Sequence, residues 1–228
     1  MLTQDTSAST TGGSLLGFLR SPILYIGLQR MLGAGRVRRI SLDRFVRLRE
    51  GERVLDIGCG PGHVLDHMPC VDYVGFDTEP RYIAYAQRHY SGRGQFFCEQ
   101  FGQAHVTKFP PFDAILLFGI IHHLDDTVAD HLLGLLARCL SPAGRVVTID
   151  PCFVPGQTWM TRLTAQWDRG RFVRDEQGYG RLVGKHFFEV ETNLFPNTGR
   201  IPSIELVMRL GSRATQGRDV KISESCRY

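Results

Sequence analysis

The sequence lacks an apolar run long enough to cross a lipid bilayer. Its N-terminal apolar stretch covers only residues 22–28, whereas a membrane-spanning helix needs about 20 apolar residues. The sequence also lacks the basic start, apolar segment and small-residue cleavage site of a secretory leader. We therefore expect a soluble, cytoplasmic protein.

Cysteine spacings typical of metal sites or redox pairs are also absent. None of the six cysteines forms a C-x-x-C pair or a metal-like set. A lone cysteine within an apolar element behaves as a small hydrophobic residue, and reduced thiols are the rule in the cytoplasm. We predict free thiols and no bound metal.

The sequence has little excess of either charge. Its 228 residues carry a net charge of +4, which is too small to indicate a nucleic-acid-binding protein by itself. Arginines nonetheless gather between residues 30 and 49. Such a cluster is typical of a solvated helical face, and it also suits an anionic substrate or a membrane surface. We expect no nucleic-acid partner and leave peripheral membrane contact through this N-terminal basic region open.

A glycine-rich motif, residues 53–63, follows a short apolar run. The run carries one acid, Asp56, and then breaks into Gly58, Gly60 and Gly62. Glycines allow a tight turn and a close approach of the backbone to a ligand. Because the spacing is Gly-x-Gly-x-Gly, with His63 next, it departs from the pattern that cradles a pyrophosphate. The motif therefore predicts a ligand without phosphate.

A second apolar run, residues 74–77, ends at Asp77, 21 positions after Asp56. Two strands joined by a glycine-rich turn, with an acid at the end of the second strand, are typical of a βαβ unit that binds an adenosine-bearing ligand. The carboxylate of Asp77 is then placed to accept the ribose hydroxyls.

The hydrophobic pattern predicts alternating strands and helices. Strands are expected at 53–57, 72–77, 95–99, 113–118 and 145–149, followed by a pair at 187–195 and 203–210. Helices are expected at 14–32, 42–48, 63–68, 80–90 and 125–140, with a turn at 141–144. Alternation of this kind predicts an α/β fold with a doubly wound, mostly parallel seven-stranded sheet. The last two strands lack a helix between them, which predicts a C-terminal antiparallel hairpin.

Four segments, 53–63, 74–77, 112–124 and 140–150, resemble in this order the motifs of the class I S-adenosylmethionine-dependent methyltransferases. The resemblance is close over residues 50–150 and looser over 186–210, and it implies a Rossmann-like fold. The histidine turn is most similar to the branch of quinone-biosynthesis and natural-product enzymes. We divide the chain into a disordered N-terminus (1–13), a helical cap (14–48), the methyltransferase domain (49–210, with an acceptor-covering insert at 151–185) and a polar tail (211–228).

The resemblance implies S-adenosylmethionine as cofactor and assigns residues to it. The main chain of Gly58, Cys59 and Gly60 would contact the methionine half, and Asp56 would attract the ammonium group. Asp77 would hold the ribose. The remaining residues predicted at the cofactor are Thr78 and Gln100 on the adenosine side, and Phe118 and Gly119 near the sulfonium.

Two adjacent histidines, His122 and His123, are candidate general bases, because imidazole has a pKa near neutrality. Asp150, at the end of the fifth predicted strand, is an alternative base or an anchor for the acceptor. The competing interpretation is that one histidine packs against the sheet and the other caps or stacks. A metal held by His122, His123, Asp125 and Asp126 is disfavoured, since adjacent histidines on a turn rarely converge on one ion.

The insert at 151–185 combines aromatic and basic residues, which suits a flat or acidic small molecule. Ordinary packing explains the aromatic residues equally well. The residues concerned are Phe153, Trp159, Met160, Trp167, Phe172 and Tyr179, with Arg162, Arg169, Arg171 and Arg174.

These features together predict a methyltransferase acting on a small-molecule acceptor, such as a natural product or a quinone-like or lipid-like compound. Two alternatives are a nucleic-acid methyltransferase and a non-catalytic S-adenosylmethionine-binding protein. The first is disfavoured because Phe118-Gly-Ile-Ile stands where base-modifying enzymes of this fold carry Asn/Asp/Ser-Pro-Pro-aromatic. The sequence makes no prediction of the oligomeric state.

Overall fold

The computed structural model of the protein describes residues 34–157, 171–197 and 203–211. The predicted disordered N-terminus, the predicted helix at 14–32 and the polar tail beyond Gly211 lie outside these ranges. No helix in the described part of the chain is both long and apolar enough to cross a membrane.

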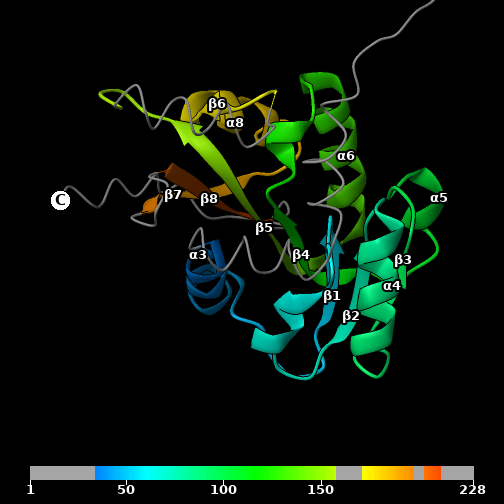
Figure 1. The fold of residues 1–228 in the computed structure, drawn as a ribbon. Coiled ribbons are helices and arrows are strands. Elements are labelled where there is room, and N and C mark those ends of the chain that lie inside the picture. The colour runs from blue at the N-terminus through cyan, green and yellow to red at the C-terminus, as the bar shows by residue number, and fades with distance from the viewer. Residues whose placement is uncertain (1–33, 158–170, 198–202, 212–228) are drawn as a thin grey trace, which may run out of the picture.

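A twisted central sheet forms the middle layer of the fold (Figure 1). Its strands are parallel except for β8, which runs antiparallel to both β5 and β7. The two-residue strand β6 (Arg174–Asp175) pairs with the end of β5. The order across the sheet is β3 (Gly94–Phe97), β2 (Asp72–Phe76), β1 (Arg53–Ile57), β4 (Phe112–Phe118), β5 (Leu140–Phe153), β8 (Ser203–Gly211) and β7 (Glu189–Asn197). The predicted doubly wound sheet and its closing antiparallel hairpin are confirmed.

Helices cover both faces of the sheet, because side chains along each strand alternate between two apolar clusters. Val54 of β1 points into the cluster beneath η1 (Leu42–Val46), η2 (His63–His67) and α4 (Pro80–His89). Leu55 and Ile57 point into the cluster beneath α6 (Asp126–Cys139) and α8 (Glu176–Val183). Three further short helices are α3 (Ala34–Ser41), α5 (Gln103–Val106) and η3 (Ile121–His123).

The parallel strands all end at one edge of the sheet. β1, β2 and β4 finish at Ile57, Phe76 and Phe118, and their register aligns Ile57 with both Phe76 and Leu117. The glycine-rich loop, Asp77 and the histidine turn follow these ends directly. In open α/β sheets, ligands bind outside the carboxyl ends of the strands where the strand order reverses, and here this place is between β1 and β4.

The structure differs from the local predictions in several places. The helix expected at 42–48 begins at Ala34 and continues from α3 into η1, because the polar arginine-rich segment 34–41 is helical as well. The helices α5 and α8 and the short strand β6 were not expected. The turn expected at 141–144 is a bulge inside β5, since Leu140 already pairs with Phe112 before Arg145 pairs with Ala114.

A buried arginine, Arg145, joins the end of η1 to the sheet. Arg145 of β5 donates hydrogen bonds to the carbonyl oxygens of Val46, Arg47 and Asp113. It also donates to both carboxylate oxygens of Glu52, at 3.1 and 2.7 Å. Burial, the largest single effect, raises the pKa of Glu52. The hydrogen bonds from Arg145 and from the Arg49 N–H, together with the positive charge of Arg145, outweigh burial, so the pKa is lowered.

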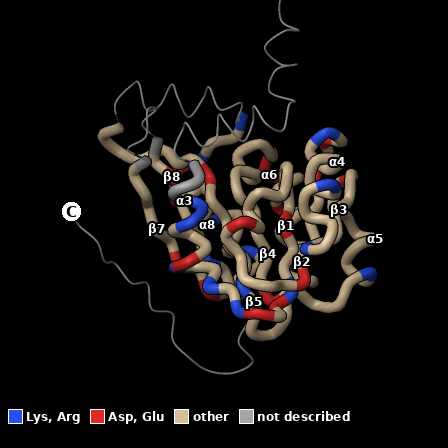
Figure 2. The backbone as a smooth tube through the Cα atoms, turned by 60° about the horizontal axis from the view of Figure 1, so that its bottom comes forward, with Lys and Arg blue, Asp and Glu red and all other residues tan. Residues whose placement is uncertain are grey.

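Acidic and basic residues are interspersed along the described backbone, as Figure 2 shows. In this view neither sign occupies a whole face. The arginines of α3, Arg38 and Arg39, lie within the N-terminal basic region named above. Contact of that region with a membrane stays a prediction.

Candidate functional site

The glycine-rich loop is attached by its backbone to the end of β2. The N–H groups of Gly58 and Cys59 both donate to the carbonyl oxygen of Phe76, at 2.8 and 3.0 Å. Gly58, Gly60 and Gly62 have φ values of 71°, 56° and 76°, a left-handed conformation that side chains strain. The three glycines are therefore required by the path of the loop.

Asp77 fastens the same loop from the end of β2. One carboxylate oxygen accepts from the N–H of Gly60 at 2.8 Å, and the other accepts from the N–H of Glu79 at 2.8 Å. Burial raises the pKa of Asp77, and these two backbone hydrogen bonds oppose the shift. Glu79, not Asp77, caps α4. Each carboxylate oxygen has a second lone pair, so Asp77 can still accept ribose hydroxyls.

Asp56 is buried one residue before β1 ends, with 4% of its surface exposed. The hydroxyl of Tyr73 donates to one carboxylate oxygen at 2.6 Å. Burial raises the pKa of Asp56 to about 7, and both this hydrogen bond and the positive charge of Arg38 oppose the shift. The carboxylate is thus a buried group whose charge is sensitive to pH near neutrality.

Arg38 is a site residue that the sequence patterns did not identify. It reaches from α3 to the glycine-rich motif, where its guanidinium lies 3.1 Å from the imidazole of His63. It is also close enough to Asp56 to stabilise the negative charge there. A guanidinium beside a carboxylate suits a ligand with an α-amino acid end, since the guanidinium can donate hydrogen bonds to the ligand's carboxylate. The only sequence signal for it was the arginine cluster between residues 30 and 49.

The turn after β4 meets the glycine-rich loop. A Cβ atom on Gly58 would lie 2.1 Å from Cδ1 of Ile120, so the Ile120 side chain fills the space that any other residue would need. Gly119 has a φ of 76°, and its N–H donates to the carbonyl oxygen of Ile149 at 2.7 Å. Phe118 is buried at the end of the strand. The predicted sulfonium-side residues therefore lie next to the loop.

His122 and Asp150 form a buried pair. Nδ1 of His122 lies 2.7 Å from Oδ1 of Asp150, and the backbone N–H of His122 donates to the same oxygen at 3.1 Å. The two residues are 1% and 0% exposed. A carboxylate that accepts from Nδ1–H fixes the imidazole tautomer in which Nε2 accepts a proton. The tautomer suits a general base, but Nε2 is itself buried, so an acceptor has to enter the turn to reach it. This burial also agrees with the competing interpretation, in which one histidine packs against the sheet.

His123 is on the same turn as His122, but its side chain has a different environment. Its side chain is exposed, and its ring lies beside the His122 ring with centroids 4.0 Å apart. The structure thus brings together two of the three predicted catalytic residues, His122 and Asp150, and places His123 on their outer side. Within the described residues, no group of three or more metal-binding side chains converges.

The residues predicted at the adenosine end follow β2 and β3. Thr78 and Gln100 are both exposed at the carboxyl edge of the sheet. The N–H of Asp77 donates to the carbonyl oxygen of Phe97, which keeps the ends of β2 and β3 together. Phe101 turns inward and packs edge-on against Phe76. The adenine contact of Gln100 remains a prediction.

The described part of the insert contributes to both the core and the surface. Tyr179 is fully buried, and its hydroxyl donates to the carbonyl oxygen of Pro151 at 3.0 Å. Arg174 forms an ion pair with Asp126. Phe172 is 38% exposed. Five residues of the predicted acceptor surface lie outside the described residues: Trp159, Met160, Arg162, Trp167 and Arg169.

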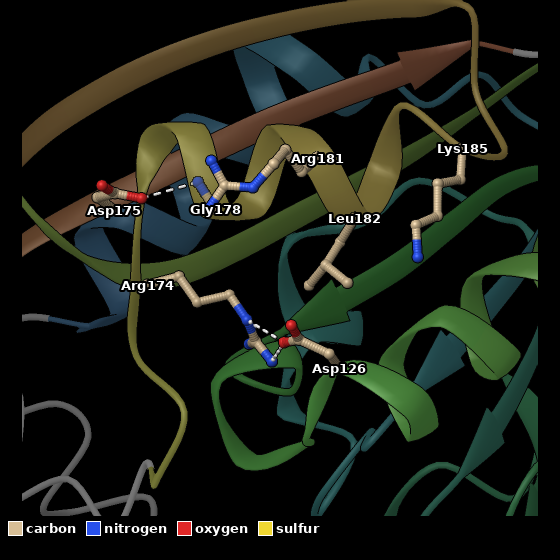
Figure 3. A pocket seen from close by; sticks show the side chains of 7 residues that line it. All are labelled: Asp126, Arg174, Asp175, Gly178, Arg181, Leu182 and Lys185. Carbon is tan, nitrogen blue, oxygen red and sulfur yellow. Dashed lines mark hydrogen bonds and ion pairs between the residues drawn. The ribbon is translucent and has the colours of Figure 1, made fainter.

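A pocket of about 450 Å³ lies between the start of α6 and α8. Figure 3 shows Arg174 and Asp126 pointing toward one another across it, with Leu182 projecting from α8. Its lining contains none of the residues predicted to hold the cofactor or act as a base. We therefore place the candidate site at the glycine-rich loop and assign this pocket no part in it.

The donor set at the carboxyl edge fits the predicted cofactor. Asp77 provides acceptors for ribose hydroxyls beside the glycine-rich backbone. Asp56 and Arg38 provide opposite charges for the ammonium and carboxylate of a methionine moiety. The site therefore has complementary groups for both ends of S-adenosylmethionine.

Comparison with known proteins supports this interpretation. A family model described as a methyltransferase domain matches residues 34–189. Phosphoethanolamine N-methyltransferase 3 of Arabidopsis thaliana is 31% identical over 151 residues, which is 62% of this chain and 30% of the relative. Trans-aconitate 2-methyltransferase of Methylobacterium nodulans is 33% identical over 103 residues, which is 43% of this chain and 38% of the relative.

The fold also matches solved structures. One is phosphoethanolamine N-methyltransferase 2 of Haemonchus contortus in complex with S-adenosyl-L-methionine, with a TM-score of 0.66 and 14% identity, covering 90% of this chain and 60% of that chain. At this identity the likeness concerns the fold alone. The chain spans about a third of the length of the curated relatives that it matches.

Proposed function

Because the chain belongs to the class I S-adenosylmethionine-dependent methyltransferases, we propose that it transfers a methyl group from this cofactor to a small-molecule acceptor. One observation carries the proposal beyond cofactor binding: His122, which is paired with the buried Asp150 of β5, lies on the same turn as Ile120, and Ile120 packs against Gly58 of the glycine-rich loop. A base and a cofactor loop are therefore adjacent.

Binding of the cofactor is assigned to residues at the strand ends. Asp77 accepts the ribose hydroxyls, and the backbone at Gly58, Cys59 and Gly60 lies against the methionine half. Arg38 pairs with the carboxylate and Asp56 with the ammonium. When bound, S-adenosylmethionine supplies an electrophilic methyl group on its sulfonium.

His122 is the proposed general base. With Asp150 accepting from Nδ1–H at 2.7 Å, Nε2 can take the proton that an oxygen or nitrogen acceptor loses as it becomes nucleophilic. Asp150 also stabilises the imidazolium that results, because it is a buried carboxylate in direct contact. His123 is too exposed to share this environment.

The acceptor is proposed to be small and acidic. The substrates in the names of the two curated relatives, phosphoethanolamine and trans-aconitate, are small molecules with acidic groups. Natural-product, quinone-like and lipid-like acceptors with an acidic group remain within this proposal. We also propose a cytoplasmic location, in agreement with the reduced cysteines expected from the sequence.

The test is transfer of labelled methyl groups. The purified protein is incubated with methyl-labelled S-adenosylmethionine and, separately, phosphoethanolamine, trans-aconitate, a small-molecule cell extract and total RNA. We expect label in a small-molecule product. Label that appears only in RNA would establish the nucleic-acid alternative, and cofactor binding without any transfer would establish the non-catalytic one.

Two variants make the assignment specific. Asp77→Ala should weaken cofactor binding by about 2 kcal/mol, or about 30-fold, since it removes hydrogen bonds to a charged acceptor. Asp72→Asn, at the other end of β2, is its matched control and should bind normally. His122→Gln should keep cofactor affinity but slow turnover roughly 100-fold or more. Calorimetry with Asp77→Ala showing unchanged affinity would remove the ribose assignment.

A further inference from the structure

Arg174 connects the end of β5, the strand that carries Asp150, to the turn after β4, which carries His122. Its backbone lies in β6, which pairs with the end of β5, and the register aligns Arg174 with Cys152. Cys152 is two residues beyond Asp150. The side chain of Arg174 extends in the other direction, to the turn that carries His122.

The guanidinium of Arg174 binds the backbone on both sides of the histidine pair. It donates to the carbonyl oxygen of Ile121 at 3.2 Å and to that of Leu124 at 2.8 Å. It also donates to the carbonyl oxygen of Phe172 at 2.8 Å and to Asp126 at 3.0 and 2.6 Å. The Arg174 side chain is 11% exposed. Its contacts with Ile121 and Leu124 are partly buried, whereas those with Phe172 and Asp126 are exposed.

The backbone of His122, which lies between Ile121 and Leu124, is bound as well. The N–H of Phe172, two residues before Arg174, donates to the carbonyl oxygen of His122 at 3.1 Å. The segment 172–174 thus binds the carbonyl groups of residues 121, 122 and 124. A turn bound at three carbonyl groups has little freedom to rotate, and the imidazole attached to it is oriented accordingly.

The ion pair with Asp126 does not explain this arrangement. Asp126 is 78% exposed, and exposed ion pairs contribute little to stability, about 0–1 kcal/mol. Hydrogen bonds from a partly buried guanidinium to backbone carbonyl groups are charge-assisted and therefore stronger than an exposed ion pair. The backbone contacts of Arg174 are therefore the significant ones.

We propose that Arg174 is a positioning residue that holds the His122 imidazole against Asp150. The segment 172–174 would then determine the orientation of the base. The role of Arg174 in catalysis rests on the proposed function; its role in orienting the pair does not. Arg174 was grouped in the sequence with residues that face the acceptor, whereas its contacts direct it to the histidine turn.

Nuclear magnetic resonance of the ¹⁵N-histidine-labelled full chain tests the proposal without an acceptor. The Nδ1 proton of His122, bonded to a buried carboxylate, should exchange slowly with water in the wild-type protein. In Arg174→Ala this proton should exchange at least tenfold faster or become unobservable. Arg174→Lys should restore part of the protection, since it keeps one donor at the turn. Should the alanine variant not fold, Arg174→Gln, which keeps two N–H donors, replaces it.

Two controls separate positioning from general stability. Asp126→Asn removes the ion pair but leaves the backbone contacts, and Arg181→Ala removes an exposed arginine of the same pocket; neither should change the His122 signal. Affinity for S-adenosylmethionine should be unchanged in all variants. An unaltered His122 signal in a folded Arg174→Ala protein would overturn the proposal. If phosphoethanolamine is methylated, kcat should fall at least tenfold in Arg174→Ala while the KM for the cofactor stays constant.

Discussion

Asp56 and Asp77 are two carboxylates of one sequence pattern in different surroundings. Asp77 is only partly buried and accepts two backbone N–H groups, whereas Asp56 is fully enclosed and accepts one hydroxyl group. Desolvation therefore dominates at Asp56 and raises its pKa to about 7. The charge that should attract the cofactor's ammonium group is therefore lost progressively as the pH falls through this value.

This pKa makes cofactor affinity depend on pH. Below pH 7 Asp56 takes up a proton, so binding an ammonium beside it must first release that proton. Affinity for S-adenosylmethionine should accordingly fall by roughly 10- to 30-fold between pH 7.5 and pH 5.5. Calorimetry at the two pH values measures the effect. Asp56→Asn should bind weakly at both; a dependence of equal size in that variant would assign it to Asp77 instead.

At the scale of residues, the sequence indicated which residues belong to the site better than it indicated where their side chains lie. Asp77 follows from strand spacing alone, because an acid after a short apolar run must lie at the strand's end. His122 and His123 could not be told apart, since only the direction of each side chain separates the buried one from the exposed one. Arg38 is 25 positions from His63, and no local pattern connects them.

At the scale of elements, β2 and the glycine-rich loop pack closely where Gly75 of β2 meets the side chain of Cys59. A Cβ on Gly75 of β2 would lie 2.8 Å from Sγ and 3.0 Å from Cβ of Cys59. The thiol is buried there, and burial raises its pKa far above the usual range. Cys59 therefore has a packing role in addition to the main-chain role predicted from the sequence.

Gly75→Ala should consequently destabilise the protein by about 1–3 kcal/mol, the usual cost of overpacking. Gly92→Ala, which meets open space, is the matched control and should have little effect. Urea denaturation of the two variants gives the comparison. Adding Cys59→Ala to Gly75→Ala should recover part of the loss, and no recovery would mean that the Cys59 side chain is not the obstacle.

Elements with a strong apolar run were predicted almost to the residue. The strand expected at 53–57 is β1, and the helix expected at 80–90 is α4. The start of β5 was missed because Ser141-Pro-Ala-Gly is typical of a turn, yet tertiary pairing of Leu140 with Phe112 extends the strand across it. The helix α3 was missed because its eight residues include three arginines and only two large apolar side chains, Val37 and Ile40, although these two are spaced as on one helical face.

At the scale of the whole molecule, Arg145 is the residue through which distant segments meet. Its side chain is 9% exposed and binds η1, the segment before β1 and the start of β4. A buried ion pair contributes little relative to apolar residues, but removing one partner leaves the other charge uncompensated.

Arg145→Leu should therefore lower the free energy of unfolding by about 3–5 kcal/mol. Arg88→Leu, on the exposed side of α4, should change it by less than about 0.5 kcal/mol. Equilibrium urea unfolding monitored by circular dichroism distinguishes the two. Equal stability of both variants would show that the network around Arg145 makes no net contribution to the free energy of unfolding. The double variant Arg145→Leu with Glu52→Leu should be more stable than Arg145→Leu alone.

The position of β5 has a consequence for biosynthesis. Its outer edge pairs with β8, and 50 residues separate Phe153 from Ser203. Ribosomes add about 5–20 residues per second, so that edge waits roughly 3–10 s for its partner after β5 has emerged. An unpaired edge with an apolar face recruits other chains, and the nascent polypeptide should be a chaperone client during this interval.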